Sequence, residues 1–238
     1  MGTVILCHNL YTMIPQINDY NGSSDALSCG AGTSAKRQTV HAFDFDGTLT
    51  SRDTFIELIR FAKGEKELWL CLLKHIHLLL AMKLGLYDNG KAKEAVFSYC
   101  FKGMTEEAFD DLCRRFASAG SCFLRSGGID MIGKLQAEWN TRVLIVTASS
   151  DRWVAPFFKD MPGVTVIGTG IEVRDGVLTG RFSTRNCHGE EKVRRISELL
   201  PDRRTYKLVA YGDSSGDCAM LDFANEGYYR PFRKKNNR

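Results

Sequence analysis

The stretch that decides the fold is Val40-His41-Ala42-Phe43-Asp44-Phe45-Asp46-Gly47-Thr48-Leu49-Thr50. Its apolar, β-branched and aromatic beginning is typical of a buried parallel strand. In open α/β sheets, ligands bind in the crevice beyond the carboxyl ends of such strands, and Asp44 and Asp46 stand at that end. Because Gly47 indicates a turn directly after them, we expect both carboxylates around one point. Two carboxylates so close repel each other, which implies a bound cation.

Two more apolar runs in the second half of the chain end in polar residues. One ends in small hydroxyl residues that begin with Thr147, and the other ends in a glycine turn that carries Asp213 and Asp217. Between these runs, Lys192 lies near the start of a predicted helix. We expect these side chains to gather with the first acid pair beyond the carboxyl ends of the strands.

The order of acid pair, hydroxyl, lysine and second acid pair resembles the haloacid dehalogenase-like (HAD) superfamily of phosphohydrolases, over roughly residues 39–232. Within it the chain is similar to subfamily IB, the branch that contains phosphoserine phosphatase and phosphatidylglycerophosphatase C. The resemblance implies an α/β fold: a Rossmann-like, doubly wound parallel sheet with an inserted α-helical cap. It also implies a phosphatase that works through an aspartyl-phosphate.

The resemblance assigns catalytic roles that fit the chemistry. A phosphate monoester is anionic and resists attack by an anion until a cation and oriented donors neutralise it. Asp44 is expected to be the nucleophile, and Asp46 the general acid that protonates the leaving oxygen and then activates water. Thr147 would hydrogen-bond a phosphoryl oxygen. Lys192 would pair with the nucleophile and the phosphate as a point charge.

The resemblance also implies Mg²⁺ as the cofactor. Mg²⁺ prefers an octahedral shell of oxygen atoms that includes several waters. The expected protein ligands are the carboxylates of Asp44 and Asp213 and the main-chain carbonyl of Asp46. Asp217 would lie one layer further out, where it orients metal-bound water or Lys192.

Alternation of strands and helices predicts the domain organisation. We expect a flexible leader at 1–38, a core at 39–53 and 126–232, a helical cap at 54–125 and a basic tail at 233–238. A β-hairpin with Asp175-Gly176 at its turn is expected within 171–182. The other predicted elements are strands at 39–46, 142–147, 164–168, 206–211 and near Tyr228, and helices at 129–139, 151–159, 190–200 and 217–224.

Composition limits the classes of partner. The formal charge of +4 comes largely from five basic residues at the C-terminus, so no basic face for nucleic acid is expected and the tail is interpreted as a solvated terminus rather than a patch for anionic lipid. Eight cysteines without a C-x-x-C pair favour a reducing cytoplasm. The oligomeric state is left open.

The most unusual part of the predicted cap is the stretch 68–86, which is apolar nearly all round. Lys74, His75, His77 and Lys83 interrupt it, so a membrane span is not expected. Two interpretations remain: a buried helix of the cap, which we favour, and a surface that faces lipid or binds an acyl chain.

The substrate is the least determined property. Phosphoserine phosphatases that resemble this chain carry a glutamate soon after the nucleophile, where this sequence has Asp53, a candidate helix N-cap. A departure of this kind weakens the case for phosphoserine as the substrate more than it weakens the case for phosphatase activity. The leading hypothesis is therefore a phosphomonoesterase for a small, soluble organic phosphate. A lipid-phosphate or phospholipid head-group phosphatase is the alternative, and a non-catalytic phosphate-binding protein is the third.

Overall fold

A computed structural model describes residues 37–233. The predicted leader, apart from Arg37 and Gln38, and the tail residues 234–238 lie outside the described residues. Within the described part, no helix has the length and apolar character needed to cross a membrane.

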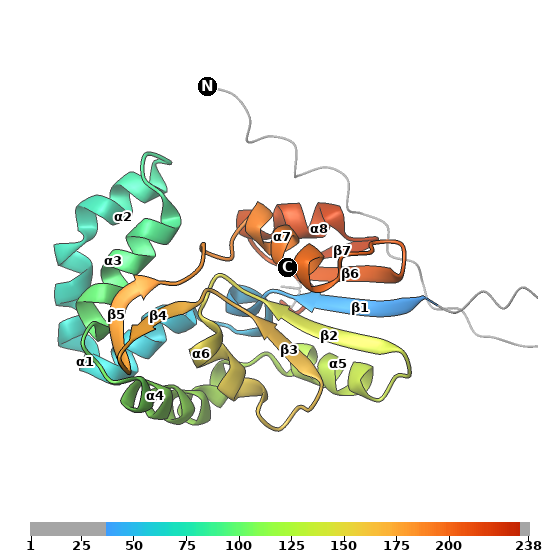
Figure 1. Cartoon of the computed structure of the whole chain (residues 1–238), viewed down its shortest axis with the longest axis horizontal. Helices are drawn as coiled ribbons and strands as arrows, with labels where there is room; N and C mark the ends of the chain where they lie inside the picture. Colours follow the sequence, from blue (N-terminus) through green and yellow to red (C-terminus); the bar gives the residue numbers. More distant parts are fainter. Residues whose placement is uncertain (1–36, 234–238) are drawn as a thin grey trace, which may run out of the picture. The chain divides into compact units, whose positions relative to one another are not determined.

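The core is one sheet of five parallel strands in the order β3-β2-β1-β6-β7 (Figure 1). The first strand of the chain is central, with its neighbours at 141–146 and 206–212 paired in parallel along its length. The strands are β1 (Gln38–Phe43), β2 (Thr141–Val146), β3 (Val164–Ile167), β6 (Tyr206–Gly212) and β7 (Glu226–Tyr229). The predicted parallel sheet is confirmed.

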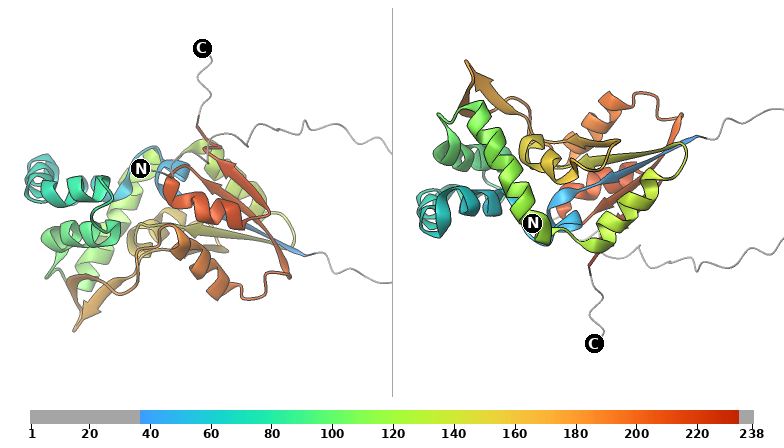
Figure 2. Two further views of the ribbon diagram at one scale, coloured as in Figure 1. Left: turned by 90° about the horizontal axis from the view of Figure 1, so that it is seen from above. Right: turned by 90° about the horizontal axis from the view of Figure 1, so that it is seen from below.

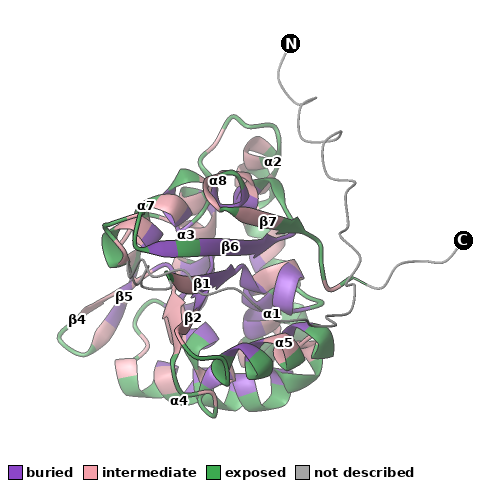
Figure 3. Ribbon diagram, turned by 90° about the vertical axis from the view of Figure 1, so that its right-hand side faces the viewer, coloured by how far each residue is buried: buried purple, intermediate pink, exposed green. Residues whose placement is uncertain are grey.

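Apolar side chains of the strands alternate between two clusters, one on each face of the sheet. Phe43 packs in one cluster with Ile132 of α5 (Ser126–Gln136). Ala42 packs in the other with Ile196 of α7 (Glu190–Leu199) and Met220 of α8 (Cys218–Phe223). Figure 1 shows α5 on one side of the sheet and α7 and α8 on the other, and Figure 3 shows how much of β1 and β6 is buried between them. The doubly wound α/β fold is therefore confirmed.

The helices of the core follow the predicted order with shifted ends. They are α5 (Ser126–Gln136), α6 (Asp151–Val154) with the 3-10 turn η3 (Ala155–Phe158), α7 (Glu190–Leu199), and the 3-10 turn η4 (Ser215–Asp217) with α8 (Cys218–Phe223). Pro156 lies at the start of η3, where it has no N–H to continue the α-helix begun at Asp151. The predicted helix at 151–159 is therefore two short helices.

The first strand is shorter than predicted. Pairing with β2 and β6 stops at Phe43, and Asp44 adds one last main-chain bond, donating to the carbonyl of Tyr211 at 2.8 Å. The chain then enters a wide helical turn, η1 (Phe45–Leu49), with Gly47 at φ 82°. Asp44 and Asp46 consequently lie on a strand end and a turn, not on one strand face.

Four helices form the cap: α1 (Thr54–Lys74), α2 (Ile76–Lys83), α3 (Asn89–Phe101) and α4 (Glu106–Ala119), followed by the turn η2 (Gly120–Phe123). The side chain of Asp53 accepts hydrogen bonds from the main-chain N–H groups of Phe55 and Ile56, so its interpretation as a helix N-cap is confirmed. Figure 2 shows these helices gathered at one end of the α/β core.

The hairpin consists of β4 (Ile171–Arg174) and β5 (Val177–Phe182), paired in antiparallel fashion. Asp175 and Gly176 both have positive φ angles, 50° and 73°, as a two-residue hairpin turn requires. The hairpin extends the cap rather than the sheet, because Leu178 exchanges main-chain bonds with Gly103 and Met104 at 2.9 Å. The predicted division into core and cap stays a prediction, and this contact shows that 171–182 belongs with the cap helices in packing.

The apolar stretch 68–86 is not one buried helix. It spans the end of α1 and all of α2, with a break at His75. Leu68 and Cys71 are buried, whereas α2 contains no buried residue. The favoured interpretation of a buried cap helix is therefore wrong for α2. Periodicity could not reveal this, because it describes the helix itself and not which neighbours cover it; α2 contacts α3 and α1 but buries no side chain.

Candidate active site

Three neighbouring strands deliver the predicted side chains to one edge of the sheet. Asp44 follows β1, Thr147 follows β2 and Asp213 follows β6. A cavity of about 300 Å³ lies at this edge, between the core and the cap. Among its lining residues are Asp44, Asp46, Thr147, Lys192, Ser214 and Asp217 from the core, and Phe55, Ile56, Leu72, Leu79, Met82, Lys93 and Val96 from the cap.

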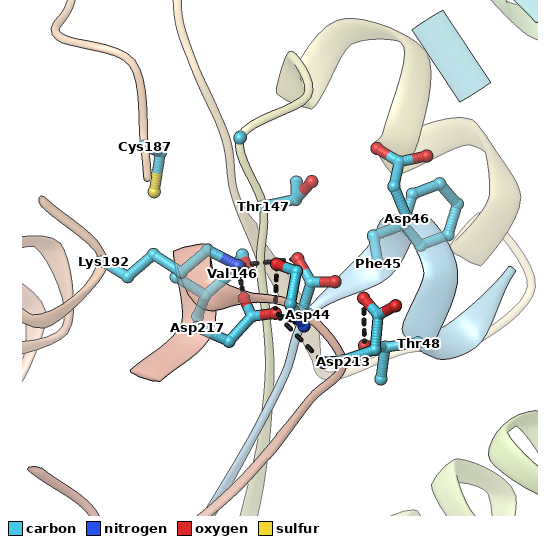
Figure 4. Close-up of polar contacts among 12 residues, drawn as sticks. Asp44, Phe45, Asp46, Thr48, Val146, Thr147, Cys187, Lys192, Asp213 and Asp217 are labelled. Atoms are coloured by element: carbon cyan, nitrogen blue, oxygen red, sulfur yellow. Dashed lines mark hydrogen bonds and ion pairs between the residues drawn. The ribbon is translucent and has the colours of Figure 1, made fainter. Parts of the chain in front are cut away.

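Lys192 is the centre of the site (Figure 4). Its Nζ atom lies 2.6 Å from Asp44 Oδ1 and 2.7 Å from Asp217 Oδ1, and it donates a third hydrogen bond to the carbonyl of Val146 at 2.8 Å. The ammonium group therefore has a partner for each of its three protons. Lys192 is only 1% exposed, so its charge is fixed in place rather than solvated.

The three charged groups perturb one another. Burial raises the pKa of Asp44 to about 7, even though the charge of Lys192 opposes this rise. Burial also acts to raise the pKa of Asp217, but the charge of Lys192 and hydrogen bonds from main-chain N–H groups outweigh it and leave that pKa below its ordinary value. The pKa of Lys192 is raised, because the two carboxylates outweigh the cost of burying its charge.

Asp213 brings a third carboxylate to Asp44 and Asp217. One oxygen of each lies within 4.8 Å of the others, and all three residues are buried. Both carboxylate oxygens of Asp217 accept hydrogen bonds. Oδ1 accepts from Lys192, and Oδ2 accepts from the main-chain N–H groups of Asp213 and Ser214 at 3.0 Å. Asp213 accepts from the Thr48 hydroxyl and forms an ion pair with Arg233, so the three carboxylates together, rather than two of them, are the candidates for binding a cation.

The local geometry fits a small divalent cation. A Cβ atom at Gly47 would lie 2.6 Å from Asp213 Oδ2, so only glycine lets the turn η1 approach that carboxylate. Oxygen atoms from two carboxylates and the neighbouring main chain are the ligands that Mg²⁺ prefers. A cation here would also offset the negative charge that Lys192 and Arg233 leave uncompensated among the three carboxylates.

Asp46 lines the same cavity but points away from Lys192 (Figure 4). Its Oδ1 accepts from the N–H and the hydroxyl of Thr54, both at 2.7 Å, and its Oδ2 accepts from the Ser149 hydroxyl at 2.5 Å. Burial is the main cause that raises its pKa, with Asp53 adding to the effect and Lys93 opposing it. The hydrogen bonds that Ser149 and Thr54 donate to this carboxylate act in the opposite direction and lower its pKa.

Sequence reasoning missed the residues that hold Asp46. Ser149 stands among the hydroxyl residues after β2, but nothing in the sequence paired it with an acid 103 positions away. Thr54 in turn accepts from the indole N–H of Trp153 at 3.3 Å, a contact between cap and core. The small hydroxyl run after the second strand was the signal that could have found Ser149.

Lys93 of α3 was also missed. Its ammonium group donates to the carbonyl of Ala148 at 3.0 Å and lies 5.4 Å from the centre of the Phe55 ring. It is therefore a cap cation positioned over the cavity.

The start of the C-terminal basic cluster is not free in solvent. Arg233 forms an ion pair with Asp213 Oδ2, and the Nε atom of Arg230 donates to the Asp213 carbonyl at 3.1 Å. Both residues are nevertheless exposed, so these contacts attach the start of the tail to the candidate site without contradicting the interpretation of a solvated terminus. Lys234, Lys235 and Arg238 lie outside the described residues.

Fold and site together define a class of protein, a doubly wound parallel sheet with a carboxylate-lysine centre at its carboxyl edge and a helical cap inserted after the first strand. A family model described as haloacid dehalogenase-like hydrolase matches residues 42–222. The chain belongs to this family.

Comparisons with individual proteins agree with the family. Protein CicA of Caulobacter vibrioides is 36% identical over 197 residues, which cover 82% of this chain and 86% of that protein. A protein of unknown function from Bordetella pertussis Tohama I has a similar structure, with TM-score 0.68, 22% identity, and coverage of 79% of this chain and 88% of the other. A substrate-bound phosphoserine phosphatase gives TM-score 0.56 at 20% identity, over 82% and 86%.

The HAD family hydrolase t0658 from Salmonella enterica serovar Typhi gives TM-score 0.61 at 18% identity. The match covers 79% of this chain and 61% of that longer hydrolase. At these identities, the solved structures show a common fold.

Proposed function

We propose that this protein is a Mg²⁺-dependent phosphomonoesterase that hydrolyses a small organic phosphate through an aspartyl-phosphate. Within its family we place it in the branch of phosphoserine phosphatase and phosphatidylglycerophosphatase C. The observation that carries the proposal is the pairing of Asp44 with a fully buried lysine at 2.6 Å, beneath a cavity large enough for a small ester. The cysteine pattern favours a cytoplasmic location.

The residues of the chain divide the reaction between them. Asp44 attacks phosphorus and forms the acyl phosphate, while Lys192 and the Thr147 hydroxyl stabilise negative charge on the phosphoryl oxygens. Asp46 gives its proton to the leaving oxygen as the ester bond breaks. Asp46 then accepts a proton from a water molecule that attacks phosphorus, which releases inorganic phosphate and restores Asp44.

Asp44 and Asp213, with the main-chain carbonyl of Asp46, would bind the Mg²⁺ ion. When bound, it supplies positive charge that lets an anionic nucleophile approach an anionic ester. Asp217 keeps Lys192 and the loop after β6 in place through its four hydrogen bonds.

A second candidate substrate class, a lipid phosphate or phospholipid head group, is favoured by the cap side of the cavity. Leu72, Leu79 and Met82 form part of its wall, and each is only partly buried. An apolar leaving group would shield these side chains from water, whereas a small polar leaving group would leave them exposed to it.

The test is a panel of phosphate monoesters, soluble and lipid, assayed with and without Mg²⁺. The wild-type protein should turn over at least one of them and a generic aryl phosphate. Asp44→Asn, which keeps the shape of the side chain, should lose turnover by about 1,000-fold or more. If the wild type binds phosphate esters but turns over none, the protein is a non-catalytic binding protein and the proposal is wrong.

A further inference from the structure

The outer surface of the cap exposes a concentrated set of large apolar side chains. Exposed large hydrophobic residues are scattered elsewhere in the described chain, but seven of them fall between positions 69 and 86. We call this set the apolar cap face: Trp69, Leu70, Leu73, Ile76, Leu80, Leu84 and Leu86. Single exposed leucines are ordinary, whereas seven exposed large apolar side chains within one stretch of the cap indicate a surface that meets an apolar partner.

The two sides of α2 have different surroundings. Leu79 and Met82 line the cavity that contains Asp44, and α2 packs on α3. Leu80 and Leu84 on the same segment are 54% and 73% exposed. Figure 1 shows the end of α1 and α2 at the edge of the cap remote from the five-stranded sheet. The apolar cap face therefore has no cover from the described part of the chain.

Between Leu68 and Tyr87 the charges are of one sign, although Glu65 accepts from the indole N–H of Trp69 at 3.1 Å and Glu67 and Asp88 stand directly outside this range. From Leu68 to Tyr87 the sequence contains no acidic residue, whereas Lys74 and Lys83 each end a helix there. Both lysines have long apolar stems that can lie along an apolar surface while the ammonium stays at a polar boundary. Leucine and tryptophan side chains flanked by lysines are typical of a surface that inserts into the head-group region of an anionic membrane.

We propose that the apolar cap face docks on the surface of an anionic lipid bilayer. A second copy of the chain is a poorer occupant, because a two-fold contact through this face would bring the lysines of both copies together. Since α2 separates the face from the cavity, docking would hold the cavity beside the membrane surface. If the proposed phosphatase activity holds, docking favours the second candidate substrate class, an ester carried by a membrane lipid, over a small soluble phosphate.

The experiment is flotation of the full chain with vesicles, without substrate. Vesicles of phosphatidylcholine mixed with phosphatidylglycerol should carry the protein, and vesicles of phosphatidylcholine alone should carry much less. The test variant is Leu73→Asp combined with Leu84→Asp, which changes two side chains that are 64% and 73% exposed. It should lower binding to anionic vesicles by about tenfold or more and leave the melting temperature unchanged.

Trp139→Asp is the matched control, because Trp139 is 82% exposed and stands outside the cap, just after α5. It should bind vesicles like the wild type. Equal binding by the double variant, or no binding by the wild type, would overturn the proposal. So would sedimentation that shows a dimer which the double variant breaks, without vesicle binding.

Hydrolysis of a soluble aryl phosphate separates this inference from the proposed function. The double variant should hydrolyse it at the wild-type rate, because neither leucine lines the cavity. If the double variant no longer binds vesicles but still hydrolyses the aryl phosphate, the substitutions have affected only the apolar cap face and not the active site. If the wild-type protein binds vesicles but hydrolyses no phosphate ester, the proposed phosphatase activity is refuted and the proposed docking surface is retained.

Discussion

Replacing Gly47 by alanine probes the closest approach in the candidate metal site. Gly47 has φ 82°, and a Cβ atom there would lie 2.6 Å from Asp213 Oδ2 and 2.7 Å from Oδ1. A carbon and an oxygen atom rest at about 3.3 Å, so the carboxylate would have to move by roughly 0.7 Å. Mg²⁺ demands near-ideal octahedral geometry and tolerates such a shift poorly.

We therefore expect Gly47→Ala to raise the Mg²⁺ concentration needed for half-maximal aryl phosphatase activity by about 10- to 100-fold. The left-handed backbone conformation should also cost roughly 1–2 kcal/mol of unfolding free energy. Gly163→Ala is the matched control, because Gly163 has φ 88° with no atom within 4 Å of the added Cβ. It should lose similar stability and keep the wild-type Mg²⁺ titration. The reasoning is refuted if both variants titrate with Mg²⁺ alike.

Three further predictions follow from the same contacts. Chelation of divalent cations should abolish phosphatase activity, and added Mg²⁺ should restore it. Ca²⁺, with longer bonds and looser geometry, should compete with Mg²⁺ without supporting turnover. Full activity in Ca²⁺ alone would contradict the proposed Mg²⁺ site. Leu68→Ala should cost about 2–5 kcal/mol in urea unfolding, because Leu68 is buried, while Leu84→Ala should change stability by less than about 0.5 kcal/mol. Hydrogen bonds from Arg194 and Arg195 hold the pKa of Glu191 at about 2, below its ordinary 4.5. This pairing stabilises the fold above pH 4.5 and is lost as the pH falls toward 2, so Glu191→Gln should lower stability by about 1 kcal/mol at neutral pH and little at pH 2; parallel stability curves would contradict this.

The parts predictable from the sequence are those whose information is local. An apolar run followed by acids and glycine specifies a buried strand and a polar turn within a dozen residues, so Asp44 and Asp213 could be placed at strand ends. Asp175-Gly176 specified its hairpin turn in the same way, because few residues accept two positive φ angles. Lys192 could be assigned to the site only from the order of the motifs along the chain, since a lysine in a helix is usually solvated.

Long-range partners could not be predicted, because no local pattern encodes them. Asp46 is held by Ser149 from the far side of the inserted cap, and the hairpin pairs with the loop before α4. The first contact depends on the pairing of β1 with β2 in the sheet, and the second on the packing of the hairpin against the cap helices. The same limit applies to Arg233, whose pairing with Asp213 looks in sequence like part of a charged tail.

Exposure of the cap helices shows the limit of periodicity most clearly. A helix that is apolar all round predicts burial on all sides, but burial also requires neighbours on every side. α2 is eight residues long, packs on α3 and α1, and contains no buried residue. Its cavity side therefore meets the candidate active site and its outer side meets solvent. One short apolar segment thus lines the cavity with Leu79 and Met82 while Leu80 and Leu84 are exposed, so the proposed catalysis and the proposed docking must be tested by separate variants.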